Sequence, residues 1–446
     1  MKYIPNTPQD REEMLEEIGA SSIEELFSDI PAEILNSYQG TEMEPLSEPE
    51  LEREFRQIAD RNGSFNDRTC LLGGGVYNHY IPAVVSHVIS RSEFATSYTP
   101  YQAEASQGTL TWMFEFQTEI AELTGMDIAN SSMYDGASAA AEAVLLSLRV
   151  REGGKILVSS TLNPYHRKVI ETYLQGLETD LQTIPSKEGR IDREYLSKYA
   201  NDSEDIASIV IQNPNYLGIV EDLRGVKETI GESLLIVDAN PISLGLLEPP
   251  GNFGADVTVG EGQPLGNPLN FGGPLLGFFA TKREYLRDLP GRVSGQTTDR
   301  DGDTGYVMAL QTREQHIRRE RATSNICTNQ ALNALAATVY LAALGPDGLS
   351  NLARINWDRA HYLAAELTKL DGIRLQWDRP FFNEFLVHTE RDPSTIWQKL
   401  KENGFDVLHP RYLCDLALDS HLLFAVTETV AKEDLDDLLT ELKELS

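Results

Sequence analysis

Two residues of this 446-residue chain are placed to bind a ligand at the edge of a sheet. Asp238 ends the apolar run Leu234-Leu-Ile-Val, and a carboxylate there is costly unless it is paired. Ligands of open α/β sheets bind at that edge, although a turn or helix-capping aspartate has the same position. His166 follows another expected strand end and either faces the same crevice or lies on the surface. The pattern therefore indicates a candidate site around Asp238.

A small-residue turn precedes an expected helix over residues 139–151. Helix N-termini present free N–H groups and the positive end of a dipole, which suits a phosphate. Gly136, Ala137 and Ser138 would form that cradle. The alternative is that small residues only let the helix pack close to the sheet.

Three polar loops are further candidates for a binding surface. Two are aromatic and glycine-rich. Such loops rarely serve a core alone, which makes them candidates for binding. The third gathers arginines and hydroxyls in an otherwise acidic chain, which suits an anion, with a solvated or salt-bridged face as the alternative. Their candidate residues are Tyr77, Asn78, His79, Tyr98, Tyr101, Gln102, Gln107, Arg318, Arg321, Thr323, Ser324 and Asn325.

The elements that must position these residues follow a βα rhythm from Lys155 onward. Short apolar runs at 155–160, 206–212, 234–238, 255–259 and 275–280 are typical of strands buried on both faces of a largely parallel sheet. We therefore expect an α/β fold with three parts. These are an N-terminal helical arm (1–65), a large domain (66–327), and a linking helix with a small C-terminal α/β domain (328–446).

Composition limits the partners. Asp plus Glu number 69 against 38 Lys plus Arg, which gives a net charge of −31. Such a field repels nucleic acid and anionic lipid. No apolar run approaches the ~18 residues of a membrane span, and the N-terminus does not read as a signal peptide, so we expect a cytoplasmic protein. Three scattered cysteines indicate no disulfide framework and no metal site. The dispersed acidity is interpreted as a salt adaptation or as an ordinary acidic composition.

The stretch from Leu234 to Lys282 resembles the centre of a pyridoxal-phosphate (PLP) enzyme of the aspartate-aminotransferase type, fold type I. In such enzymes an aspartate pairs with the cofactor's pyridinium nitrogen and a later strand delivers the lysine that binds PLP. Asp238 matches the aspartate. The lysine position reads Gly262-Gln-Pro-Leu-Gly266 and holds no amine, and Lys282 lies past the far end of the next strand. We therefore expect no PLP bound covalently to this chain.

Longer motifs are similar to the glycine cleavage system P-protein, and more narrowly to its subunit 1 in organisms that split it into two chains. The resemblance covers essentially the whole length. The motifs are Gly73-Gly-Gly-Val-Tyr-Asn-His-Tyr80, Tyr98-Thr-Pro-Tyr-Gln102, Ser106-Gln-Gly-Thr109, Ser132-Met-Tyr-Asp-Gly-Ala137, Gly260-Glu-Gly-Gln-Pro-Leu-Gly266 and Arg318-Arg-Glu-Arg-Ala-Thr-Ser-Asn-Ile-Cys-Thr328.

The resemblance implies a subunit of glycine dehydrogenase (aminomethyl-transferring), an oxidoreductase that decarboxylates glycine and passes the aminomethyl group to the lipoyl arm of H-protein. It places PLP in subunit 2, with an α2β2 assembly, and it makes the candidate loops part of the partner's site. This chain's own pocket would be degenerate, with Gln263 and Pro264 in place of a His-Lys pair. Its residues would be Gly136, Ala137, Ser138, His166, Asp238, Gln263 and Pro264.

Two other interpretations stay open at this point. In the first, the chain is only a structural or regulatory scaffold for its partner. In the second, it is an independent PLP lyase or transferase that uses another lysine.

Overall fold

The structure is a computed structural model that describes residues 6–38, 40, 43–65, 67–202, 205–327, 329–414 and 416–444. Thr328, the last residue of the predicted cationic motif and the first of the predicted C-terminal part, lies outside the described residues. The chain divides into two compact units, Met1–Gly63 and Ser64–Ser446.

The first unit contains short helices with clear local start signals. Thr7 and Asp10 form a capping box, in which the Asp10 amide donates to the Thr7 hydroxyl at 3.2 Å and the Thr7 amide donates to the Asp10 carboxylate at 2.6 Å. Every described side chain of these helices is exposed or half-buried. The elements are α1 (Pro8–Ile18), η1 (Glu24–Phe27), α2 (Ala32–Ser37) and α3 (Glu48–Ala59).

The second unit is built on a seven-stranded sheet with the strand order β2-β10-β9-β8-β7-β3-β4. Strands β9, β8, β7, β3 and β4 run parallel, while β10 runs antiparallel to both β9 and β2. The predicted α/β fold with a mainly parallel sheet is confirmed. The strands are β2 (Ile128–Ala129), β3 (Lys155–Ser159), β4 (Asp180–Ile184), β7 (Ile206–Asn213), β8 (Leu234–Ala239), β9 (Val257–Glu261) and β10 (Gly277–Thr281).

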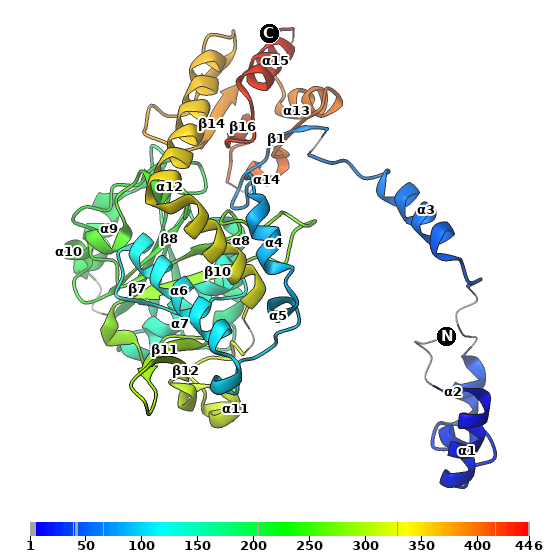
Figure 1. The fold of residues 1–446 in the computed structure, drawn as a ribbon. Helices are drawn as coiled ribbons and strands as arrows, with labels where there is room; N and C mark the ends of the chain where they lie inside the picture. The colour runs from blue at the N-terminus through cyan, green and yellow to red at the C-terminus, as the bar shows by residue number, and fades with distance from the viewer. Residues whose placement is uncertain are drawn as a thin grey trace. The chain divides into compact units, whose positions relative to one another are not determined.

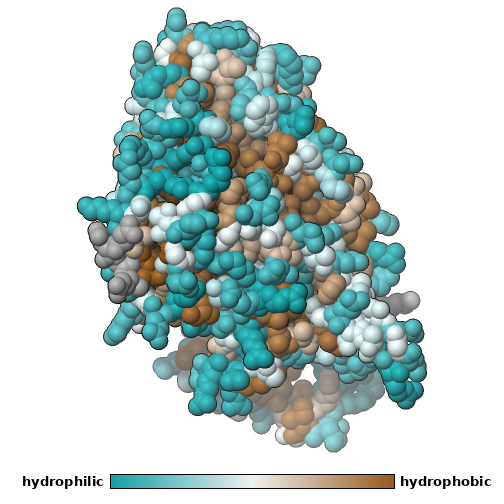
Figure 2. All heavy atoms as spheres, turned by 90° about the vertical axis from the view of Figure 1, so that its left-hand side faces the viewer, coloured by the Kyte–Doolittle hydropathy of each residue, from teal (hydrophilic) through white to brown (hydrophobic). Residues whose placement is uncertain are grey.

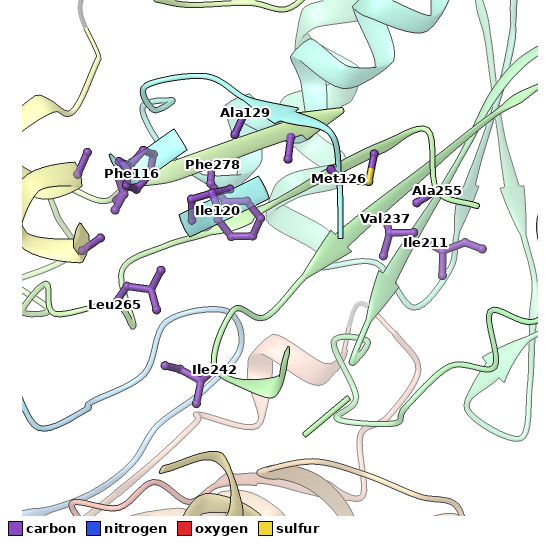
Figure 3. Close-up of a cluster of buried hydrophobic side chains, with 14 of the residues drawn as sticks. Phe116, Ile120, Met126, Ala129, Ile211, Val237, Ile242, Ala255, Leu265 and Phe278 are labelled. Atoms are coloured by element: carbon purple, nitrogen blue, oxygen red, sulfur yellow. The ribbon is translucent and has the colours of Figure 1, made fainter. Parts of the chain in front are cut away.

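Helices cover both faces of this sheet (Figure 1), and alternation along each strand supplies a hydrophobic core on each face. Val237 of β8 points into the core that α6 and α12 cover, whereas its neighbour Ile236 points into the core under α7 and α8. Figure 3 shows the first of these cores, in which Phe116 and Ile120 of α6 lie beside Phe278 of β10. Burial on both faces explains why the strands read as continuous apolar runs.

The helices around the sheet vary widely in length. The longest, α12, contains a break at Gly345 and Pro346, where Gly345 has φ 61° and ψ 180°. It continues into the C-terminal part of the chain (Figure 1). The helices are α4 (Ala83–Ile89), α5 (Ser92–Ala95), α6 (Gln107–Thr124), α7 (Gly136–Val150), α8 (Pro164–Leu174), α9 (Arg193–Asp202), α10 (Val226–Ile230), α11 (Gln315–Arg318) and α12 (Ala331–Leu367).

The C-terminal part has its own core and an antiparallel sheet of order β13-β14-β16. The early strand β1 joins it, because Thr69 pairs in parallel with Phe405 of β15. The elements are β1 (Thr69–Leu71), β13 (Ile373–Leu375), β14 (Glu384–Thr389), α13 (Pro393–Glu402), β15 (Phe405–Val407), α14 (Arg411–Cys414), β16 (His421–Ala425) and α15 (Lys432–Lys443).

Short elements complete the second unit. A β-hairpin of β11 and β12 packs against α6, and 3₁₀ turns fill several connections. They are η2 (Ala103–Ala105), β5 (Ser186–Lys187), β6 (Arg190–Ile191), η3 (Ser243–Gly245), η4 (Pro250–Phe253), η5 (Arg283–Tyr285), β11 (Val293–Thr298), β12 (Thr304–Ala309), η6 (Gln311–Arg313) and η7 (Arg319–Arg321).

The surface is mostly hydrophilic on the face drawn in Figure 2, with hydrophobic side chains scattered among polar ones. Within the described ranges, no helix combines the length and the apolar character needed to cross a membrane.

Candidate functional site: a closed cofactor-type pocket

A cavity of about 390 Å³ lies at the carboxyl edge of the parallel strands, where ligands of open α/β sheets bind. A narrower space of about 20 Å³ adjoins it, and the two share Gly75, His166 and Glu261. Asp238 lines the narrower one. The cavity is lined by Gly73, Gly74, Gly75, Val76, Asp135, Ala137, Asn163, Tyr165, His166, Tyr216, Glu261, Leu275, Leu408 and Tyr412, and the narrower space also by Tyr77, Gln212, Asp238, Ala239, Asn240, Pro241 and Pro264.

Asp238 and His166 form a buried pair. The carboxylate ends β8 and is 3% exposed, and its Oδ2 lies 2.6 Å from Nδ1 of His166 in the first turn of α8. Burial lowers the pKa of His166, but the charge and hydrogen bond of Asp238 outweigh it, so the pKa lies above its ordinary value. The sequence prediction that these two residues face one crevice is supported by this geometry. Asp238 already has a partner inside the chain.

Two N–H groups at the N-terminus of α7, those of Gly136 and Ser138, are engaged within the chain. Asp135 caps the helix, because its Oδ1 accepts a hydrogen bond from the Ser138 amide at 2.7 Å. The Gly136 amide donates to Oε2 of Glu261 at 2.9 Å. Ala137 lines the cavity between them. At the position predicted to hold a phosphate, two carboxylates of this chain accept the Gly136 and Ser138 N–H groups.

Glu261 is the residue that sequence reasoning missed. It ends β9, is 8% exposed, and its Oε1 accepts hydrogen bonds from the amides of Gln263 at 2.9 Å and Leu276 at 3.0 Å. Burial raises its pKa to about 7, although the Gly136, Leu276 and Gln263 amides favour the charged form. The signal available in the sequence was a lone glutamate between two glycines beyond an apolar strand.

Gln263 and Pro264 stand where the resemblance expects a His-Lys pair in a PLP-binding chain. Gln263 is 1% exposed and bonds the backbone of Tyr77 twice, with Oε1 accepting from its amide and Nε2 donating to its carbonyl, each at 3.0 Å. Pro264 faces the narrower space beside Asp238. Gln263 is thus a strut that fixes the Tyr77 backbone, and Pro264 lines the same narrow space as Asp238.

Lysine and arginine are absent from the described lining of both spaces. Lys282 instead pairs with Asp256, which precedes β9, and its amide donates to the Asp256 carbonyl at 3.2 Å. Glu261 lies at the other end of β9. The interpretation that Lys282 sits at the wrong edge of the sheet is confirmed.

The segment from Gly73 to Tyr80 is held by carboxylates of the C-terminal part. Glu384 of β14 accepts hydrogen bonds from the Gly74 amide at 2.7 Å and the Tyr77 hydroxyl at 2.9 Å, and burial raises its pKa to about 7. Glu428 lies 2.9 Å from Nδ1 of His79. Tyr77 and His79 are therefore buried inside this chain rather than presented on its surface, while Asn78 is half-buried and its Nδ2 lies 3.4 Å from Thr429 Oγ1.

The second predicted loop is more accessible. Tyr98 is 71% exposed and Tyr101 61% exposed, and the Tyr101 ring lies 6.3 Å from the ring of His316, edge to face. Gln102 is exposed as well. Gln107 differs, because both ends of its amide bond the backbone of Tyr306, each at 2.9 Å. Gln107 anchors the loop, and the tyrosines remain available.

The cationic segment lies beside this loop and outside both cavities. Arg318, Arg321 and Asn325 are exposed, and Arg321 is 3.8 Å from Glu320. Thr323 and Ser324 are half-buried, with the Thr323 amide bonded to Arg313 and the Ser324 hydroxyl accepting from the Ile326 amide at 3.0 Å. The contact of Tyr101 with His316 joins the two predicted loops into one surface.

These observations decide whether a phosphate cofactor fits the pocket. A phosphate at the α7 N-terminus would need the Gly136 N–H that Glu261 holds, and it would lie among Asp135, Glu261 and Asp238. An imine would need an amine where Pro264 stands. The residues present do not fit PLP. Among the described residues there is also no group of three or more His, Cys, Asp or Glu side chains that could hold a metal ion.

The fold defines the class, which is that of the fold type I PLP enzymes, and the described lining of the pocket holds no lysine. The fold is shared with the glutamate decarboxylase of Lactobacillus brevis, at a TM-score of 0.67, with 15% identity over 96% of this chain and 96% of that one.

The family follows from closer matches. The family model "Glycine cleavage system P-protein" matches residues 1–442. A relative named "Probable glycine dehydrogenase (decarboxylating) subunit 1" from Desulfitobacterium hafniense is 48% identical, over 100% of both chains. A crystal structure titled glycine decarboxylase (P-protein) of the glycine cleavage system, in inhibitor-bound form, is 44% identical, covers 100% of both chains and has a TM-score of 0.91. The chain belongs to the glycine cleavage system P-protein family.

Proposed function

We propose that this chain is the PLP-free subunit of a glycine dehydrogenase (aminomethyl-transferring) and works only in complex with a PLP-bearing partner. One observation carries the proposal, namely that Glu261 accepts the Gly136 N–H at the start of α7 while Pro264, and no lysine, lines the described space beside Asp238. The relatives named as subunit 1 over the full length support the pairing with a second subunit.

In this proposal PLP sits in subunit 2 and accepts the electron pair that decarboxylation leaves on the glycine α-carbon. The aminomethyl group then passes to the lipoyl arm of H-protein. The assembly is an α2β2 heterotetramer. This chain contributes residues that complete the partner's site.

The surface formed by Tyr98, Tyr101 and the segment 318–325 is the best candidate for that contribution. Two large aromatic side chains are exposed there, and exposed aromatics are enriched at protein interfaces. Exposed Arg318 and Arg321 lie in the same segment. A guanidinium can balance the charge of a phosphate or carboxylate in the partner's site.

The test uses the assembled enzyme with Arg321→Ala or Thr323→Ala. Losing one charge-assisted hydrogen bond to a largely buried anion costs about 1.5–3 kcal/mol, or about 10- to 150-fold in rate or PLP retention. We expect that loss in glycine decarboxylation without dissociation of the complex. Arg224→Ala is the matched control, because Arg224 is 79% exposed and pairs with a nearby aspartate, as Arg321 is 81% exposed and pairs with Glu320.

The competing function is a scaffold that only stabilises its partner. It predicts that both variants keep wild-type kinetics and cofactor content, as the Arg224→Ala control does. That result would replace the proposal with the scaffold interpretation.

A further inference from the structure

We propose that Glu261 is a built-in substitute for the cofactor's phosphate, so that this chain's pocket is closed to phosphate-bearing ligands independently of the missing lysine. The inference concerns the chain's own pocket and does not depend on the proposed role in the partner's site.

The position of the Glu261 carboxylate supports this directly. Helix α7 is 15 residues long, and without Glu261 the Gly136 N–H of its first turn would have no acceptor among the described residues of the chain. Oε2 of Glu261 accepts the Gly136 N–H at 2.9 Å, which is the geometry of a bound anion at a helix N-terminus. A buried carboxylate of the chain thus makes the contact that a phosphate oxygen would make.

The backbone keeps Glu261 in this position. Its other oxygen holds the Gln263 and Leu276 amides at 2.9 and 3.0 Å, so both oxygens are engaged. The N-terminus of α7 also packs tightly on the end of β9, because a Cβ at Gly136 would lie 2.8 Å from the Glu261 nitrogen. Because the two elements lie this close, the Glu261 side chain reaches the helix N-terminus directly. A ligand at the helix would have to displace the Gly136 bond, while the other two bonds hold the carboxylate in place.

The surrounding charge acts in the same direction. Asp135 borders the same cavity and Asp238 the narrower space, while the described lining of both contains neither lysine nor arginine. His166 is the one histidine among these residues, and Asp238 holds its Nδ1 at 2.6 Å. An incoming phosphate would meet like charge, and the histidine beside it is already paired with Asp238.

The experiment compares full-length wild type, Pro264→Lys, Glu261→Gln and the double variant. Glu261→Gln is chosen because the new amide oxygen can still accept from the Gln263 and Leu276 amides, whereas its NH₂ cannot accept from Gly136. Inorganic phosphate and PLP binding are measured by equilibrium dialysis. PLP adducts are measured by borohydride trapping and peptide mapping.

We expect Glu261→Gln to bind inorganic phosphate on the order of 10-fold more tightly than wild type, with PLP competing for the same site. Pro264→Lys alone should yield no stoichiometric adduct, and the double variant should trap PLP on the introduced lysine. Glu384→Gln is the matched control, since Glu384 is also a buried carboxyl with a pKa raised to about 7 but does not contact α7. It should gain no phosphate binding.

Two results would overturn the inference. One is a single specific adduct per chain in Pro264→Lys with Glu261 intact, which would show that the lysine alone was missing. The other is a Glu261→Gln protein with wild-type circular dichroism that binds phosphate no better than wild type. If Glu261→Gln does not fold, Glu261→Ala is assayed for the same gain, and its absence in folded protein counts against the inference equally.

Discussion

Replacing Gln263 by leucine should release the Gly73–Tyr80 segment. The side chain is 1% exposed and makes three hydrogen bonds to backbone groups, two to Tyr77 and one to the Asn267 carbonyl at 2.7 Å. Leucine has a similar volume but no polar atoms, so Tyr77 and Asn267 lose their partner. At about 1 kcal/mol for each lost bond, the cost is about 3 kcal/mol.

The magnitude sets the assay. A cost of about 3 kcal/mol corresponds to roughly 150-fold more frequent opening of the segment. Hydrogen exchange of peptides covering residues 73–80 should accelerate by that order, because a sub-global opening controls their protection. Peptides from α13 should keep their wild-type rates. Urea unfolding then reports whether any of the cost reaches the whole fold.

The matched control is Gln398→Leu, since Gln398 makes an exposed contact with Glu402 one helical turn away. It should change neither exchange nor stability by more than about 0.5 kcal/mol. An acceleration below threefold at 73–80 in Gln263→Leu would refute the strut interpretation. Equal acceleration across the sheet would refute its local character.

Three further predictions concern the fold. Gly218→Ala should destabilise the protein by about 2 kcal/mol more than Gly176→Ala. The two glycines have similar φ, 82° and 83°, but only at Gly218 would a Cβ meet a backbone oxygen, that of Glu384 at 1.8 Å. Equal midpoints of urea unfolding for the two variants would contradict this. Burial raises the pKa of Glu384 to about 7, so its protonated form stabilises the fold fully below about pH 4.5. This contribution to the free energy of unfolding, on the order of 3 kcal/mol, is lost as pH rises through about 7. Glu384→Gln should flatten that pH dependence in thermal melts from about pH 4.5 to about 7.5. Salt screens the repulsion within a chain of net charge −31, so the melting temperature should rise with salt concentration. A melting temperature that does not change with salt would support the ordinary acidic composition over the salt adaptation.

The sequence predicted the sheet strands β3, β7, β8, β9 and β10 but missed β2 and β4, and it did not give the strand ends. The expected strand 255–259 is β9 at Val257–Glu261. Asp256 explains the shift, because its side chain bonds the Leu235 amide at 2.8 Å and pairs with Lys227 and Lys282 at the start of the strand. Two residues of shift place Glu261 at the carboxyl edge. Spacing along one chain does not reveal such a long-range contact.

The candidate site was predictable in its location and not in its internal partners. Asp238, His166 and the α7 N-terminus meet as their positions after strands indicate, since parallel strands end at one edge. Tyr77 and His79 were expected on an interface because aromatic loops often bind. Their acceptors, Glu384 and Glu428, come from more than 300 residues later, and no local pattern connects them.

The pairing of β1 with β15 has a consequence for biogenesis. Thr69 can form its parallel pair only after Phe405 has been synthesised, and Gly74 finds its acceptor only with Glu384. At about 5–20 residues per second, the wait is roughly 20 to 70 s. During that interval the glycine segment that lines the cavity can bond Asn163 and Gln263 but not Glu384, while the central sheet can already assemble. The glycine segment that lines the cavity is therefore synthesised early, whereas Glu384 and β15, which hold it, are synthesised late. We expect a chaperone to be needed most during this interval, while the segment lacks these contacts.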